Sequence, residues 1–118
     1  WKCYWCNRLP FHDNVTVINE NETESYGYVT SSSDEIVASF RGTIGTLKSW
    51  IVDLQSVIKV AWPSEKAPSG ASVGRGFLKA WIAIRTPVLF AIADRITPST
   101  KKIIFTGHSL GAAISILA

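Results

Sequence analysis

The sequence contains no methionine and only two cysteines, and it has no internal repeat or long low-complexity tract. No apolar run approaches the roughly 18 residues that suggest a membrane span, so no membrane-spanning helix is expected. The formal net charge of +3 comes from singly scattered Lys and Arg residues, which excludes a basic stripe for nucleic acid. The composition, with 47% hydrophobic and 18% charged residues, is typical of a folded globular chain rather than a disordered one.

The two ends of the sequence indicate that these residues are part of a larger domain. Without a methionine, an initiator and anything after it are expected to be missing from the N-terminal side. The last seven residues, "AAISILA", form an apolar, helix-forming pattern with no glycine or polar residue to cap it. We therefore expect residues 1–118 to form a partial catalytic domain whose C-terminal half is absent from this sequence.

The cysteines and two glycosylation sequons bear on the compartment. Cys3 and Cys6 lie in "CYWC", a spacing that suits a redox pair, half of a zinc site or a small disulfide. A redox motif would follow a strand, and a zinc site needs more ligands than the sequence supplies nearby. Asn14 and Asn21 each begin an Asn-x-Thr glycosylation sequon. Two sequons beside a close cysteine pair indicate secretion, which favours a Cys3–Cys6 disulfide over free thiols.

The first half of the sequence alternates strand and helix patterns. Strand-forming residues predict a short strand at 15–18 and a hairpin formed by 26–30 and 35–40. From Thr46 the apolar spacing becomes helical. A loop rich in Pro, Ser and Gly is then expected over residues 62–76.

The second half predicts a long helix, a strand and a final helix. Residues 77–96 have mixed helical periodicity, and Pro87 is expected to kink this helix or divide it. Residues 101–106 form a strand pattern, which a sharp turn joins to a helix beginning at Ser109. This order of elements predicts an α/β layered domain.

The pattern Gly-x-Ser-x-Gly spans residues 107–111, between the last predicted strand and the last predicted helix. That setting defines a nucleophile elbow, a turn so tight that the residues flanking the serine must lack bulk, as Gly107 and Gly111 do. The following helix directs free backbone N–H groups to the place where negative charge develops. The bare pattern is weak, but its strand-turn-helix setting makes Ser109 a candidate nucleophile.

None of the histidines is expected to serve as the catalytic base. His108 is next to the nucleophile and points in another direction, whereas a base must lie within about 3 Å of the hydroxyl. In this architecture the chain order is serine, then acid, then histidine, which disqualifies His12 as the base. The same order disqualifies Asp53 and Asp94 as the triad acid.

Four stretches carry a resemblance to the class 3 lipase family, the secreted triacylglycerol lipases of filamentous fungi and the related feruloyl esterases. "GHSLGAA" matches the family's nucleophile motif, and "IVASFRGTIGTLKSWIVDL" is similar to its strand, oxyanion loop and lid helix. "VGRGFLKAW" resembles the segment that opens the next long helix, although Gly74 stands where many members have a histidine. "CYWC" looks like a short disulfide loop found in some members.

The resemblance implies an α/β-hydrolase fold with a mostly parallel central sheet and a secreted serine ester hydrolase, with triacylglycerol lipase the favoured activity. It implies Ser109 as the nucleophile, the Leu110 N–H as one oxyanion donor, and Thr43 as a second donor through its N–H and hydroxyl. The triad Asp and His are expected after the elbow helix, in the remainder of the catalytic domain. The expected substrate is a lipid or another ester at an interface, and no cofactor, metal or nucleic acid is expected.

The apolar stripe of residues 44–54 fits two structures. Its spacing suits a core-facing helix and equally a lid that covers the site in water and turns outward at a lipid surface. Gly42 and Gly45 are available as hinges, and the resemblance favours the lid. The residues expected to contact substrate from it are Ile44, Leu47, Trp50 and Ile51.

One alternative from another functional class stays open. A catalytically silent homologue that binds lipid or ester would keep the elbow without a full triad. Retention of both Ser109 and Thr43 argues against that alternative, because decay would be free to alter either residue.

Overall fold

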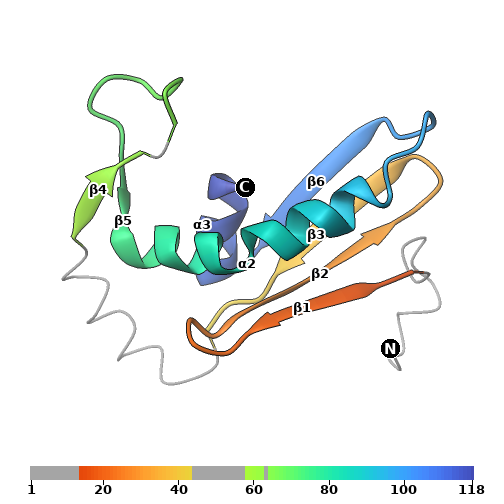
Figure 1. Ribbon diagram of the computed structural model, residues 1–118, viewed down its shortest axis with the longest axis horizontal. Helices are drawn as coiled ribbons and strands as arrows, with labels where there is room; N and C mark the ends of the chain where they lie inside the picture. The colour runs from red at the N-terminus through yellow and green to blue at the C-terminus, as the bar shows by residue number, and fades with distance from the viewer. Residues whose placement is uncertain (1–13, 44–57, 63) are drawn as a thin grey trace.

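The computed structural model describes residues 14–43, 58–62 and 64–118 (Figure 1). Within these ranges the elements follow in the order β1 (Thr16–Glu20), β2 (Ser25–Ser31), β3 (Glu35–Phe40), β4 (Lys59–Ala61), β5 (Ser72–Gly74), α2 (Arg75–Ala93), β6 (Lys102–Gly107) and α3 (Leu110–Leu117).

Four of the strands form one sheet in the order β1-β2-β3-β6. The pairs β1–β2 and β2–β3 are antiparallel, whereas β6 is parallel to β3, with Ile36 opposite Ile103 and Phe40 opposite Gly107. The strands predicted at 15–18, 26–30, 35–40 and 101–106 are confirmed with small shifts of their ends. The parallel pairing places the end of β3 beside the end of β6, where the elbow begins.

The expectation of a plain loop over residues 62–76 is wrong at its C-terminal end. Residues 72–74 form β5, which pairs antiparallel with β4 in a separate two-stranded hairpin at the start of α2 (Figure 1). The helix α2 then begins at Arg75. Two three-residue strands are too short for a period-2 pattern to show in the sequence.

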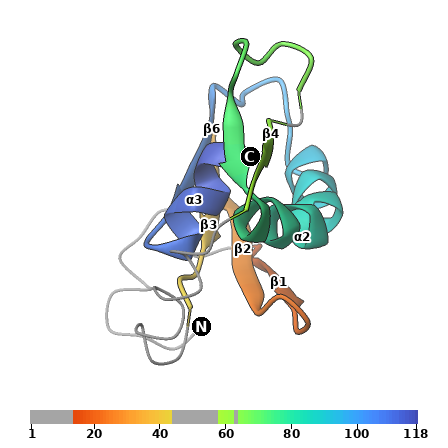
Figure 2. The same ribbon diagram turned by 90° about the vertical axis from the view of Figure 1, so that its left-hand side faces the viewer.

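One face of the sheet carries the hydrophobic core. Alternate residues of β3 point to this face, and α2 and α3 lie side by side over it (Figures 1 and 2). The ring of Phe40 meets the Trp81 ring edge to face, with centroids 6.3 Å apart. The buried core residues are Ile18, Val29, Ile36, Ala38, Phe40, Ala80, Trp81, Ile84, Val88, Ala91, Ile92, Leu110 and Ile114.

The helix α2 passes through Pro87 as one continuous element, so of the two expected effects the division is wrong, and the kink stays a prediction. The buried stripe of α2 lies on both sides of the proline and includes Ile84 and Val88. Packing of this stripe on the sheet outweighs the lost backbone hydrogen bond.

Helix α2 is also long and apolar enough to cross a membrane by length and composition alone, a test that core helices pass as well. Its buried stripe nevertheless belongs to the core formed with the sheet. We therefore describe α2 as a core helix.

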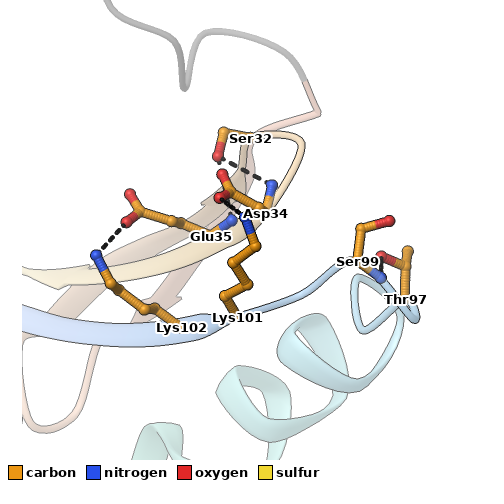
Figure 3. A network of polar contacts seen from close by, with 7 residues as sticks. All are labelled: Ser32, Asp34, Glu35, Thr97, Ser99, Lys101 and Lys102. Carbon is orange, nitrogen blue, oxygen red and sulfur yellow. Dashed lines mark hydrogen bonds and ion pairs between the residues drawn. The ribbon is translucent and has the colours of Figure 1, made fainter.

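Exposed ionic contacts join the start of β6 to the start of β3. The Lys101 ammonium lies 3.2 Å from the Asp34 carboxylate, and the Lys102 ammonium lies 3.0 Å from the Glu35 carboxylate (Figure 3). The hydrogen bond to Glu35 raises the pKa of Lys102 above its ordinary value. In addition, the Lys101 N–H donates to the Asp34 carbonyl oxygen at 2.7 Å.

A buried guanidinium joins the end of α2 to the start of β1. Arg95 is 7% exposed, and its Nη1 donates to the Ala91 carbonyl oxygen at 2.7 Å. Its Nη2 donates to the Thr16 hydroxyl at 2.7 Å and to the backbone carbonyl of Asn14. These bonds satisfy most of the buried charge and hold the first described strand under the helix.

Candidate active site

Ser109 sits in the sharp turn between β6 and α3, and its backbone is strained. Its φ is 56° and its ψ is −122°, and only two other non-glycine residues in the described part of the chain, Asn14 and Glu24, have a positive φ. An L-residue seldom adopts such a conformation unless its surroundings impose it. Ser109 is also exposed at the surface, so the turn presents its hydroxyl to an incoming ligand.

Close packing explains why the turn has glycines on either side of the serine. A Cβ on Gly111 would overlap the carbonyl oxygen of Phe40, and a Cβ on Gly107 would overlap the backbone of Gly111 and lie 2.8 Å from the same Phe40 oxygen. The first turn of α3 therefore lies directly against the end of β3. No side chain fits between them.

This packing brings the loop after β3 to the nucleophile. A Cβ built on Gly42 would lie 3.4 Å from the Cβ of Ser109 and 3.0 Å from the His108 carbonyl oxygen. The next residue, Thr43, has a buried hydroxyl with no hydrogen-bond partner among the described residues. A buried donor left unpaired costs free energy, so such a group is a candidate for contact with a ligand.

Leu110 is the first residue of α3, with Ser109 as the N-cap. The N–H groups of a first helical turn have no acceptor within the helix. The N–H of Gly111 is already used, since it donates to the His108 carbonyl oxygen at 2.9 Å. The Leu110 side chain is 2% exposed and belongs to the core, which fixes its backbone beside Ser109.

The described residues supply no base to Ser109. His108 is exposed, and no hydrogen bond between described residues joins its ring to Ser109. Asp94 follows the last turn of α2, where its N–H donates to the Phe90 carbonyl oxygen at 3.0 Å. Within residues 14–43, 58–62 and 64–118, no group of three or more His, Cys, Asp or Glu side chains is placed to hold a metal ion.

The predicted glycosylation residues have their side-chain oxygens engaged. Asn14 and Asn21 are both exposed. The Asn14 amide oxygen accepts a hydrogen bond from Arg95 at 3.4 Å, and the Asn21 amide oxygen accepts one from the Tyr26 hydroxyl at 3.0 Å. Several other predicted residues lie outside the described part of the chain: Cys3, Cys6, His12, Ile44, Leu47, Trp50, Ile51 and Asp53.

The strand-elbow-helix unit and the sheet beneath it define an α/β-hydrolase. The family model for lipase (class 3) matches residues 37–118. This range includes most of β3, the loop to Thr43 and the elbow, so the chain belongs to the class 3 lipase family.

Curated relatives agree with this family. The chain is 31% identical to a lipase of Rhizopus niveus over 122 aligned positions, which cover 100% of the chain and 30% of that lipase. It is 32% identical over 95 positions to the secreted mono- and diacylglycerol lipase 1 of Fusarium solani, covering 80% of the chain and 27% of that relative. The chain thus spans less than a third of the length of these relatives.

Solved structures confirm the fold class. The lipase of Rhizopus microsporus var. chinensis matches 99% of the chain with a TM-score of 0.77 and 26% identity, over 40% of its own length. The triacylglyceride lipase of Rhizomucor miehei matches 86% of the chain with a TM-score of 0.73 and 27% identity, over 38% of its length. Another match, a triacylglycerol lipase with a TM-score of 0.73 and 26% identity, is described as having a serine protease triad as its catalytic centre.

Proposed function

We propose that this chain supplies the nucleophile and the oxyanion hole of a secreted carboxylic ester hydrolase that acts on acylglycerols. One observation carries the proposal: the strained, exposed Ser109 lies directly beside the segment that leads to Thr43, whose hydroxyl has no partner among the described residues. A nucleophile and polar donors around one point are two of the parts that acyl transfer needs, and a general base is the third. The names of the relatives, as lipases of triacylglycerides and of mono- and diacylglycerols, support acylglycerols as the substrate class.

The proposed reaction begins when the Ser109 hydroxyl attacks the ester carbonyl carbon and loses its proton to a histidine. The carbonyl oxygen becomes an oxyanion that accepts hydrogen bonds from the Leu110 N–H and from the N–H and hydroxyl of Thr43. Each such donor contributes about 3 kcal/mol to the transition state. The alcohol then leaves with the proton from the histidine, and water hydrolyses the acyl-serine by the same steps.

The base and its orienting acid are proposed to come from the remainder of the catalytic domain, of which residues 1–118 form the N-terminal portion. Two observations support this division. Among the described residues, no histidine forms a hydrogen bond with Ser109, and the chain spans only 30% of the Rhizopus niveus lipase. In the same proposal, residues 44–54 form the lid over the site, and its apolar side chains contact the lipid surface.

Replacement of Ser109 by Ala in the complete protein, meaning this chain together with the rest of its domain, tests the nucleophile. We expect ester hydrolysis to fall by a factor of roughly a million, to the level that binding and the oxyanion hole sustain alone. Labelling by a fluorophosphonate probe should be lost with it. Ser115→Ala is the matched control, because Ser115 lies on the same helix and its hydroxyl donates to the Gly111 carbonyl oxygen.

Near wild-type hydrolysis by Ser109→Ala would refute the nucleophile assignment. A wild-type protein that binds lipid but neither hydrolyses esters nor takes the probe would instead support the silent homologue.

Comparison of Trp50→Ser with wild type on emulsified triacylglycerol and on a dissolved short-chain ester tests the lid. Only a loss confined to the emulsion supports it.

A further inference from the structure

Arg41, the first residue after β3, is tied twice to Tyr26 on the neighbouring strand. Its guanidinium carbon lies 3.8 Å from the centroid of the Tyr26 ring, over the ring face. Its backbone N–H donates to the Tyr26 carbonyl oxygen at 2.8 Å. A cation over an aromatic face is attracted by the ring quadrupole, and arginine also stacks its plane on the ring.

Tyr26 is itself anchored at its far end. Its hydroxyl donates to the Asn21 amide oxygen at 3.0 Å, in the turn between β1 and β2. Its backbone lies opposite Asn19 in the antiparallel pairing of these two strands. The ring therefore has a fixed orientation when Arg41 stacks on it.

These contacts lie immediately before the loop that reaches the nucleophile. The ladder of β3 ends at Phe40, and Gly42 and Thr43 follow Arg41 directly. On the other side, the backbone of Gly111 packs against Phe40 and Arg41. The start of the loop is thus held between the Tyr26 ring and the first turn of α3.

We propose that Tyr26 is a positioning residue for the oxyanion hole, acting through Arg41 to hold Thr43 at the distance from Ser109 that the reaction needs. The proposal rests on the function proposed above. An oxyanion donor must lie about 2.7–3.1 Å from the developing charge, and a misplacement of about 1 Å costs on the order of a hundredfold in rate.

The surroundings of Tyr26 separate this role from packing. The ring borders a groove of about 400 Å³ on the sheet face opposite the core, together with Val17, which is 73% exposed. Removal of the ring widens an open groove and leaves no closed cavity, so the free energy of unfolding should change little.

The test compares Tyr26→Leu, Tyr26→Phe and Arg41→Gln in the complete protein, with a dissolved short-chain ester as substrate. Tyr26→Phe keeps the ring but loses the hydroxyl bond to Asn21, so it separates the stack from its anchor. We expect Tyr26→Leu and Arg41→Gln each to lower kcat by roughly tenfold with KM and melting temperature near wild type, and Tyr26→Phe to fall between Tyr26→Leu and wild type. The double variant should be no slower than the slower single variant, because both changes remove one interaction.

Amide hydrogen exchange gives a readout that does not depend on activity. Residues 41–43 should exchange faster in Tyr26→Leu than in wild type or Tyr26→Phe. Unchanged kcat and unchanged exchange in Tyr26→Leu would overturn the proposal, as would additive losses in the double variant or an effect on KM alone. If the Tyr26 variants overturn this proposal while Ser109→Ala is inactive, the proposed function is unaffected. An active Ser109→Ala refutes the proposed function itself.

Discussion

The Thr43 hydroxyl is buried and has no partner among the described residues. A buried hydroxyl without a hydrogen bond costs about 1–3 kcal/mol, so folding alone gives no reason to keep it. In the proposed mechanism the cost is met in the transition state, where the hydroxyl donates to the oxyanion. Thr43 therefore differs from Thr16, whose hydroxyl accepts a bond from Arg95 and contributes to the folded state.

Thr43→Val should lower turnover by roughly ten- to a thousandfold, because it removes a donor to the oxyanion while keeping the shape of the side chain. The melting temperature should stay the same or rise, since no hydrogen bond in the described structure is lost. Thr43→Ser, which retains the hydroxyl, is the control. Steady-state kinetics and thermal unfolding of the three proteins check both parts, and an unchanged turnover in Thr43→Val would remove the hydroxyl from the oxyanion hole.

At the scale of elements, the contact between α3 and the end of β3 decides whether the site forms. Gly111 of α3 and Gly107 at the end of β6 both lie close to the Phe40 backbone, and the loop to Thr43 begins at the same point. A helix pushed outward here would carry Ser109 with it. The packing of α3 against the end of β3 and the position of Ser109 in the site therefore depend on the same contact.

Gly111→Ala should destabilise the protein by roughly 2 kcal/mol or more, because its Cβ would overlap the Phe40 carbonyl oxygen and the backbone must shift. Gly76→Ala is the matched control. Gly76 lies in the first turn of α2, and nothing is within 4 Å of a Cβ built on it, so this change should be neutral or stabilise the helix by up to about 1 kcal/mol. Urea unfolding measures both, and equal effects would contradict the close packing.

Local patterns account for what the sequence predicted well. The strands at 26–30 and 35–40 have uninterrupted runs of strand formers around a polar turn. The elbow was predicted because its glycines and serine are neighbours in the sequence. Tyr26 and Arg41 meet across two strands, and no spacing in the sequence signals such a stack. Pro87 does not divide α2, because tertiary packing outweighs the local preference of proline.

At the scale of the whole molecule, the secretory features remain predictions. Asn14 and Asn21 are exposed, and each uses its amide oxygen in a hydrogen bond, which leaves the amide nitrogen for a glycan. Mass spectrometry of the non-reduced protein from a eukaryotic secretory host should find glycan on Asn14 or Asn21 and a Cys3–Cys6 disulfide. Asn19 is exposed without a sequon and should be unmodified. Free thiols and bare asparagines would argue against secretion.

The parallel pairing of β3 with β6 also determines when activity can arise. The ion pair at the start of these strands joins residues 67 positions apart, so the strand pairing closes a long loop and is a slow, non-local event in folding. The hairpin of β1 and β2 needs only its own turn and forms locally. Until β6 docks, Ser109 and Thr43 belong to separate parts of a nascent chain. Catalytic competence during refolding should therefore appear after secondary structure and together with the closure of the central sheet.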